Sequence, residues 1–496
     1  MISSGKQHDP EQLLHALLYL REDILATSAP TINRWERYIA PNRYPIQASL
    51  ENLAHYMALR RHDLRELQDS LRLWGLSSLG RIEGQVLPNL DAVINTLGHL
   101  SGYHHLTPDQ PSLDDFTHGR KLLDLESEAV LGTAPEHRRV RVMVTMPSHA
   151  TDDLTLIEDL IAHGMNIARI NCAHDTPAQW EQMIANIRQV ADRLGKSVKI
   201  AMDLAGPKAR TADIQPAHSQ RVYVGDHLLL HNGELPQHAS YTELMQVRCT
   251  LPEAITQVQE GVPVWFDDGK IGTIVEQKLD GALILRVTRA RQDGDKLKPE
   301  KGINFPQTPL TLSALTEEDK THLDFVVAHA DIINYSFVQQ VSDIHTLQTE
   351  IATHKPDHPI ALVLKVETSL SVKNLPELIA SALVHQPVGV MIARGDLAVE
   401  LGFERLAEMQ EEILWICEAA HVPVIWATQV LETLAKKGRP SRSEVTDAAM
   451  SERAECVMLN KGDYIVRALD ILDSILIRMN QHQCKKVSRL RALHSW

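Results

Sequence analysis

Residues 360–393 read IALVLKVETSLSVKNLPELIASALVHQPVGVMIA and carry the clearest fold signal in the chain. The stretch begins with the apolar run 360–365 and ends with a second apolar run, 389–393. The segment between the two runs is amphipathic and long enough for a helix. Two buried strands joined by a helix are typical of a parallel β-α-β unit, so the stretch predicts an α/β fold with a parallel sheet.

The same alternation of apolar run and amphipathic helix occurs eight times along the chain. The runs are residues 140–145, 166–171, 198–203, 331–336, 360–365, 389–393, 424–427 and 456–459. Eight strand-helix units in succession are typical of a closed (β/α)8 TIM barrel. We therefore expect this barrel to be the central domain of the protein.

The alternation is interrupted between the third and fourth runs. Apolar residues there recur at every second position, as at Val222 and Val224 and again at Val264 and Phe266, which indicates β-strands. Three Asp-Gly pairs, at 268–269, 280–281 and 293–294, are turn signals. We expect a small β-barrel domain over residues 212–299, inserted after strand three as a lid.

The amino-terminal part of the chain has a helical pattern. Leu64, Leu67 and Leu71 show the spacing of three and four residues that indicates helices, and a polar stretch over 101–136 is typical of a linker. We expect an N-terminal helical extension and linker over residues 1–136. The barrel domain would then comprise residues 137–211 and 300–496.

Composition excludes several classes of protein. The 496 residues include 50 Lys and Arg against 64 Asp and Glu, a net charge of −14, and aromatic residues make up only 4%. An acidic chain without a long basic run is a poor partner for nucleic acid. No apolar stretch approaches a membrane span or a signal-peptide core, and the five cysteines are scattered without a metal-binding spacing. We expect a cytoplasmic protein that binds neither nucleic acid nor membranes.

Polar residues follow five of the predicted strands at the point where each strand ends. They include Arg169, Asn171, Asp203, Lys365, Glu367, Arg394, Gly395, Asp396 and Thr428. Active sites of TIM barrels lie at this end of the strands, and buried charges are costly unless they are paired or bound to a metal. Each charge alone is more often part of a structural ion pair, but their convergence from several strands predicts a functional site.

The residue types at these strand ends suit phosphate or enolate chemistry. Glu367 and Asp396 could together hold a hard divalent cation such as Mg²⁺, which takes one or two carboxylates and completes its shell with water and substrate oxygens. Lys365 would face the same way as Glu367, because alternate residues of a strand share a face. A lysine, a guanidinium and a divalent ion around one small pocket would stabilise a phosphoryl group or an enolate.

These motifs resemble those of the pyruvate kinase family. The matching segments, in the family's order, are 164–171 (GMNIARIN), 203–211 (DLAGPKART), 266–271 (FDDGKI), 365–367 (KVE), 391–397 (MIARGDL), 427–431 (ATQVL) and 440–447 (PSRSEVTD). The resemblance covers about residues 140–479, which is the barrel and its insert. It implies a phosphotransferase that converts phosphoenolpyruvate and ADP to pyruvate and ATP in glycolysis.

The resemblance also implies roles for individual residues. Glu367 and Asp396 would hold Mg²⁺ or Mn²⁺, and Lys365 would neutralise the phosphoryl group in transfer. Arg169 would grip the phosphoryl oxygens and Arg210 the nucleotide phosphates. The backbone amides of Gly395 and Asp396, with Thr428, would hold the substrate carboxylate, and Thr428 would lie near the enolate face that is protonated. Ser336 matches a serine of the family's strand-four motif and is expected to contact substrate.

A monovalent cation is the second metal of this family, and its site differs here. Asn171 and Asp203 match two of its usual ligands, but Ala173 stands where a serine is usual. Lys208 occupies the position at which potassium-dependent members have glutamate, and its ammonium could replace the charge of the ion. We therefore expect that K⁺ is not required.

Other segments differ from the family pattern and keep two alternatives open. Residues 173–175 (Ala-His-Asp) replace the usual segment beside the nucleotide site, which would suit a Mg²⁺-dependent lyase or aldolase that acts through a pyruvate enolate without a nucleotide. A catalytically weak regulatory homologue is the second alternative. The family's C-terminal regulatory domain is expected to be absent, and we expect a homo-oligomer.

Overall fold

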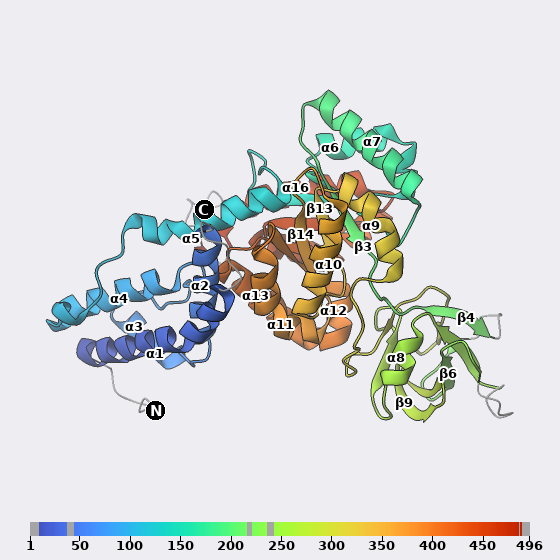
Figure 1. Ribbon diagram of the computed structural model, residues 1–496, viewed down its shortest axis with the longest axis horizontal. Helices are drawn as coiled ribbons and strands as arrows, with labels where there is room; N and C mark the ends of the chain where they lie inside the picture. Colours follow the sequence, from blue (N-terminus) through green and yellow to red (C-terminus); the bar gives the residue numbers. More distant parts are fainter. Residues whose placement is uncertain (1–8, 37–43, 216–220, 236–242, 486, 489–496) are drawn as a thin grey trace.

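The computed structural model describes residues 9–36, 44–215, 221–235, 243–485 and 487–488. Three parts follow one another along the long axis of the molecule in Figure 1: a group of N-terminal helices, a central barrel and an inserted β-sheet. Residues 1–8 of the expected extension and 489–496 of the expected barrel domain lie outside the described residues.

The central domain is a closed barrel of parallel strands, which confirms the predicted (β/α)8 fold. Its strands in chain order are β1 (Arg141–Thr145), β2 (Ile167–Asn171), β3 (Lys199–Leu204), β13 (Ile332–Tyr335), β14 (Ala361–Val366), β15 (Val388–Ala393), β16 (Val424–Ala427) and β17 (Cys456–Leu459). Barrel strands that follow one another in the chain also lie next to one another in the barrel. The last strand, β17, pairs with β1 and closes the barrel. Each strand overlaps one of the eight apolar runs of the sequence.

The helices that connect the barrel strands form its outer layer. They are α6 (Leu154–Ala162), α7 (Pro177–Leu194), α9 (Glu317–His329), α10 (Val341–His354), α11 (Ser369–Leu383), α12 (Arg394–Leu401), α13 (Phe403–Ala419), α14 (Glu432–Lys437), α15 (Arg442–Met450) and α16 (Ile465–Asn480). In β14, Val363 belongs to the cluster inside the barrel, whereas Leu362 and Leu364 pack outward against helices. Both faces of the strand are buried, which explains its nearly continuous apolar sequence.

The insert is a barrel-like sheet with its own apolar core. Its main sheet has the order β12-β8-β9-β10-β6-β7-β4, and a short pair, β11-β5, lies beside it. The elements are β4 (Thr211–Gln215), β5 (Arg221–Val222), β6 (His227–His231), β7 (Met245–Cys249), α8 (Pro252–Gln257), β8 (Pro263–Phe266), β9 (Ile271–Leu279), β10 (Ala282–Arg289), β11 (Asp295–Lys296) and β12 (Ile303–Asn304). β4 and β12 extend just beyond the expected limits of 212 and 299, and those domain limits stay a prediction.

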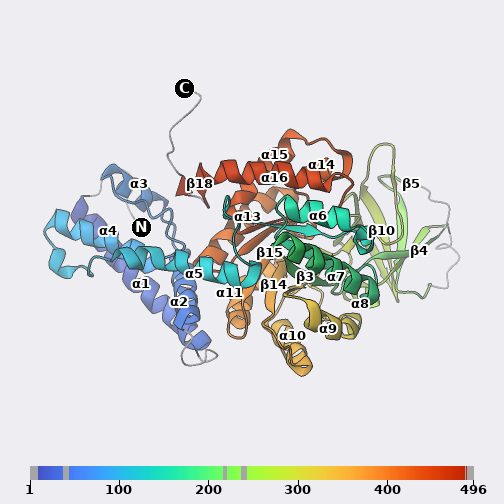
Figure 2. The ribbon, with the colours of Figure 1, turned by 90° about the horizontal axis from the view of Figure 1, so that it is seen from above.

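The N-terminal segment is helical, and its last helix reaches the barrel (Figure 2). The helices are α1 (Pro10–Glu36), α2 (Tyr44–Leu59), α3 (Arg65–Leu73), α4 (Val86–Ser101) and α5 (Leu113–Leu131). Val130 and Leu131 belong to the cluster inside the barrel, and a carboxylate oxygen of Glu126 accepts from the amide of Val388 at 2.6 Å. Because Val388 is the first residue of β15, α5 closes the amino-terminal end of the barrel.

Two minor features complete the described chain. A short hairpin, β18 (Gln483–Cys484) with β19 (Val487–Ser488), follows α16. Among the described residues, the helices are too short or too polar to cross a membrane.

Candidate active site

The charged residues predicted at the strand ends come together at the carboxyl-terminal end of the barrel. Arg169 lies in the middle of the short strand β2, and Asp203 and Lys365 are the next-to-last residues of β3 and β14. All three residues are at most 9% exposed. The structure therefore gathers these charges in a buried cluster, on the opposite side of the barrel from α5.

Arg169 and Asp203 form the base of this cluster. The Nε and Nη2 atoms of Arg169 donate to the two carboxylate oxygens of Asp203 at 2.9 and 2.7 Å, and its Nη1 donates to Thr145 Oγ1 at 2.9 Å. Asn334 Nδ2 also donates to Asp203, at 2.6 Å. Burial alone would raise the pKa of Asp203, but the charges of Arg169 and Lys365 outweigh it and lower the pKa to about 2. Asp203 is therefore a fixed negative charge that orients Arg169.

Lys365 is held by three partners, one from the end of its own strand and two from β3 and the end of β13. Its Nζ donates to Ser336 Oγ at 2.7 Å and lies 3.1 Å from Glu367 Oε1 and 3.2 Å from Asp203 Oδ2. Burial would lower the pKa of Lys365, but the carboxylates of Glu367 and Asp203 raise it. The ammonium group is therefore charged and fixed in position, as electrostatic stabilisation of a transferring group requires.

Glu367 and Asp396 place two carboxylates close enough to interact. Burial and the charge of Asp396 raise the pKa of Glu367, although Lys365 opposes the shift. The amide of Phe337 donates to Glu367 Oε2 at 2.7 Å. For Asp396, burial is outweighed by the ammonium of Lys208, which lowers its pKa. Like charges in one buried site are the arrangement that a divalent cation relieves.

Lys208 forms an ion pair with Asp396. Its Nζ is 2.8 and 2.9 Å from the two carboxylate oxygens, and the Lys208 side chain is 24% exposed. The expected monovalent-cation ligands lie elsewhere: Asn171 pairs with Asp203 across β2 and β3, and Asp203 is already neutralised by Arg169 and Lys365. The structure thus places the lysine charge on a predicted ligand of the divalent metal.

Thr428 follows β16 in a strained backbone conformation. Its φ of 63° is unusual for a β-branched residue, and Gln429 next to it has a φ of 60°. The Oγ1 of Thr428 accepts a hydrogen bond from the amide of Gly395 at 2.9 Å. The hydroxyl hydrogen of Thr428 therefore points away from Gly395 and can be donated to another group. The first turn of α12 and the end of β16 are thereby joined where the substrate carboxylate is expected.

Arg394 is a residue whose role the sequence did not reveal. Its Nε donates to the carbonyl of Ala427 at 3.0 Å, its Nη2 donates to the carbonyl of Thr428, and it forms an ion pair with Asp447. Its guanidinium carbon lies 4.9 Å from the centre of the Trp426 ring. These contacts stabilise the strained turn at Thr428. The sequence feature that could have indicated this role is the position of Arg394 in the segment 391–397, directly before Gly395 and Asp396.

A cavity of about 250 Å³ lies beside Arg169, on the side of β1 and β2. Its lining includes Thr145, Asn171, His174, Lys436 and Lys461. Burial, Lys461 and Arg210 lower the pKa of His174, so Arg210 lies near this cavity although it does not line it. The lining also includes Asp175 and Glu432, and Glu432 forms an ion pair with Lys436. The positive charges that remain for a polyphosphate are those of Lys461 and of Arg210 nearby, with the free N–H donors of Arg169.

Comparison with known proteins identifies the family. A family model described as the barrel domain of pyruvate kinase matches residues 137–468. The chain belongs to the pyruvate kinase family. It is 30% identical over 377 residues to human pyruvate kinase PKLR, which covers 73% of this chain and 62% of the human protein. It is also 30% identical over 353 residues to the pyruvate kinase of Geobacillus stearothermophilus, covering 69% of this chain and 57% of that protein.

The matches cover part of the length of each relative. The pyruvate kinase of Dictyostelium discoideum is 29% identical over 347 residues, covering 68% of this chain and 65% of that protein. The chain thus spans about three fifths of the length of the curated relatives that it matches. The matched region contains the barrel and its insert, which is where the charged cluster lies.

The donor set fits Mg²⁺, the metal that the pyruvate kinase family generally uses. Glu367 is 3% exposed. The carboxylate of Asp396 is partly buried and already binds one cationic group, the ammonium of Lys208. Two carboxylates suffice for Mg²⁺, which takes its other ligands from water and substrate. No group of three or more His, Cys, Asp or Glu side chains with metal-binding geometry occurs among the described residues.

Proposed function

We propose that the protein is a pyruvate kinase that transfers the phosphoryl group of phosphoenolpyruvate to ADP and gives pyruvate and ATP. The observation that carries the proposal is the buried ammonium of Lys365, held between Ser336, Asp203 and Glu367 at the carboxyl-terminal end of the barrel. Phosphoryl transfer depends mainly on positioning and on neutralising the charge of the transferring group, and this site supplies both.

The chain's own residues would divide this work among three strand ends. Arg169, fixed by Asp203, would bind phosphoryl oxygens with its remaining N–H donors. Lys365 would neutralise the phosphoryl group between its donor and acceptor oxygens, with Ser336 holding the ammonium in place. Arg210, close to His174, would bind the nucleotide phosphates. ADP would thus occupy the cavity beside Arg169.

The opposite side of the site would hold the three-carbon part of the substrate. Amides at the start of α12, at Gly395 and Asp396, and the hydroxyl of Thr428 would bind the substrate carboxylate. Glu367 and Asp396 would hold Mg²⁺ or Mn²⁺, which supplies Lewis-acid stabilisation of the phosphoryl and enolate oxygens. The enolate would then take a proton at its methylene carbon on the face near Thr428, which gives pyruvate.

The direct test is to mix the purified protein with phosphoenolpyruvate, ADP and Mg²⁺ and to follow pyruvate and ATP separately. We expect equal amounts of the two products. Lys365→Met should lower the rate by at least about 10²–10³-fold while the circular dichroism spectrum is unchanged. Lys199→Met is a matched control, because Lys199 pairs with Asp331 at the other end of the barrel strands, 3.1 Å away.

The same assay separates the alternative functions. Pyruvate without ATP would contradict phosphoryl transfer to nucleotide and favour a phosphatase or lyase. Absence of both products with intact fold would favour a regulatory homologue. A cytoplasmic location and a homo-oligomeric state stay predictions, and gel filtration with light scattering would test the second.

A further inference from the structure

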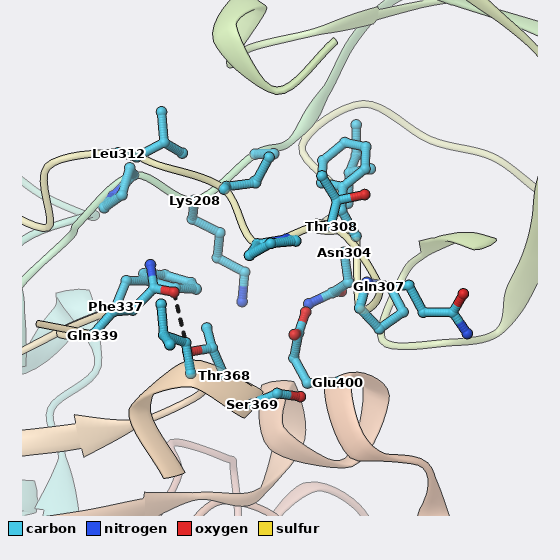
Figure 3. Close-up of a pocket in the computed structure, with 18 of the residues that line it drawn as sticks. Lys208, Asn304, Gln307, Thr308, Leu312, Phe337, Gln339, Thr368, Ser369 and Glu400 are labelled. Atoms are coloured by element: carbon cyan, nitrogen blue, oxygen red, sulfur yellow. Dashed lines mark hydrogen bonds between the residues drawn. The ribbon is translucent and has the colours of Figure 1, made fainter. Parts of the chain in front are cut away.

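A separate cavity of about 300 Å³ lies between the barrel and the segment that returns from the insert (Figure 3). It is bordered by residues 303–310 and Leu312 on one side and by Phe337, Gln339 and the start of α11 on the other. Lys208 is the one residue proposed for the active site that lines it, among the residues that the structure describes. The cavity is therefore a neighbour of the active site and shares one cationic side chain with it.

The walls of this cavity are mostly apolar. The apolar side chains include Phe305, Pro306, Leu310, Leu312, Phe337 and Leu370. Small-molecule sites are typically apolar cavities of about 300–1,000 Å³ with a few convergent polar groups, and this cavity meets the lower limit of that range. An apolar body of modest size, such as one phenyl ring with a short chain, matches these walls.

The polar groups of the cavity provide a cationic end. Figure 3 shows the ammonium nitrogen of Lys208 pointing into the space between Phe337 and Asn304. An ammonium group has three N–H donors, and the two oxygens of Asp396 accept two of them, so one donor remains for a ligand. Lys373 lies exposed on the rim and adds a second positive charge.

Glu400, the one acidic residue among the described residues of the lining, reduces this positive field only in part. Burial, together with the charge of Asp396, raises the pKa of Glu400 to about 7. The amide of Ser369 donates to Glu400 and keeps its carboxyl at the wall. Thr368 is likewise engaged, through its Oγ1 with Gln339 Oε1 at 3.4 Å. The charged groups of the lining are thus Lys208, whose charge is partly neutralised by Asp396, the rim residue Lys373, and one carboxyl of weakened acidity.

We infer that this cavity is a second ligand site for a small amphipathic carboxylate, with its carboxylate at the ammonium of Lys208 and its apolar body against Phe305, Phe337 and Leu310. This binding is independent of the proposed phosphoryl transfer. A ligand here contacts the segment that connects the insert to the barrel, and its carboxylate takes the N–H donor of Lys208 that Asp396 leaves free.

The test uses two probes that share an apolar body and differ in charge. We would titrate the full-length protein, without substrates or nucleotide, with 3-phenylpropionate and with 3-phenylpropan-1-ol, and measure binding by isothermal titration calorimetry. We expect one site for the carboxylate. The alcohol should bind at least about tenfold more weakly than the carboxylate, because it lacks the ion pair with Lys208. Equal binding of both probes, or no binding of the carboxylate, would overturn the proposal.

Two tryptophan variants locate the site. Ser369→Trp, at the first residue of α11, places a large ring into the cavity and should abolish binding of 3-phenylpropionate. Ser342→Trp, near the start of α10, is the matched control, because Ser342 is exposed and outside the lining; it should bind like the wild type. Binding that persists in Ser369→Trp would place the site elsewhere and overturn the proposal.

Charge at the rim provides a further check. Lys373→Gln should weaken binding of 3-phenylpropionate by about threefold and leave that of the alcohol unchanged, since the rim charge acts only on the anion. An equal loss for both probes would contradict the electrostatic role. Because these titrations involve no turnover, a protein that binds the carboxylate but lacks kinase activity would overturn the proposed function and leave this inference intact.

Discussion

The ammonium of Lys208 lies within 2.9 Å of both carboxylate oxygens of Asp396, although the two residues are 188 positions apart in the chain. Lys208 follows β3 at the point where the chain leaves the barrel for the insert, and Asp396 lies in the first turn of α12. The pair therefore links the base of the insert to a predicted metal ligand. A tethered positive charge at this place compensates the carboxylates of Asp396 and Glu367 without a monovalent cation.

We expect the wild-type enzyme to turn over at the same rate with and without K⁺, because Lys208 carries a fixed charge at Asp396. Lys208→Met should lower turnover by at least about tenfold, since the carboxylates of Glu367 and Asp396 then lose one of their compensating charges. Part of this loss should return when K⁺ is added. The measurement is the rate of pyruvate formation in K⁺-free buffer and after addition of KCl.

The control for this prediction is tetramethylammonium chloride at the same ionic strength, because that ion is too large for a site between carboxylates. Rescue of Lys208→Met by both salts would indicate screening in general and not site occupancy. A wild-type enzyme that is inactive without K⁺ and active with it would show that Lys208 does not replace the ion.

Asp396→Asn should weaken divalent-metal binding and leave the fold intact. The substitution keeps the size of the side chain but removes one of the two negative charges that attract the metal. We expect the Mn²⁺ concentration for half-saturation to rise by about tenfold or more, measured by electron paramagnetic resonance of free Mn²⁺. Asp357→Asn is a suitable control, because the Asp357 side chain is 96% exposed and lies before β14, at the amino-terminal end of the barrel. Unchanged Mn²⁺ binding in Asp396→Asn would remove Asp396 from the metal site.

Much of the barrel could be predicted from sequence because its signals are local. An apolar run such as 360–365 buries both faces of its strand, so the pattern depends on few distant contacts. The positions of Arg169, Lys365 and Glu367 followed from the rule that functional residues lie where barrel strands end. Their detailed roles stay predictions until activity is measured.

Other features could not be predicted because they depend on contacts between distant segments. The partner of Lys208 is set by how the chain enters the insert, and the role of Arg394 depends on Asp447 and on the strained turn at Thr428. The burial of Val130 and Leu131 inside the barrel is a further case, since the sequence around them was assigned to a linker. No local pattern encodes these tertiary contacts.

Acidification should loosen the contact between the N-terminal helices and the barrel through His421. This residue is 4% exposed; its Nε2 donates to the carbonyl of Gly84 at 2.8 Å, and its Nδ1 lies 2.9 Å from Ser49 Oγ. Burial lowers the pKa of His421 to about 4. The unfolded chain, with an ordinary histidine pKa of about 6.5, therefore binds more protons between pH 6.5 and pH 4.

The sign of the effect follows from this difference. The free energy of unfolding should be highest above pH 6.5 and should fall by up to about 3 kcal/mol as the pH is lowered to 4. His421→Asn should reduce this pH dependence, because asparagine tolerates the φ of 55° at this position and does not titrate. Urea unfolding at pH 7 and pH 5 would measure it. Identical pH dependence in the variant and the wild type would exclude His421 as its source.

Gly119→Ala should destabilise the same contact by steric overlap. A Cβ atom at Gly119 would lie 2.0 Å from the carbonyl oxygen of Gly84 and 2.6 Å from His421 Nε2, so α5 would have to move away from both. Alanine is the better helix former by about 1 kcal/mol, but overpacking of this kind costs about 1–3 kcal/mol. The overlapping atom here is a backbone oxygen of Gly84, which cannot move aside as a side chain could. We expect a lower midpoint of thermal unfolding and faster proteolysis between α4 and α5. Gly84→Ala is the matched control, because a Cβ atom there meets nothing within 4 Å. If the two variants were equally stable, α5 would not be packed against Gly84 in solution.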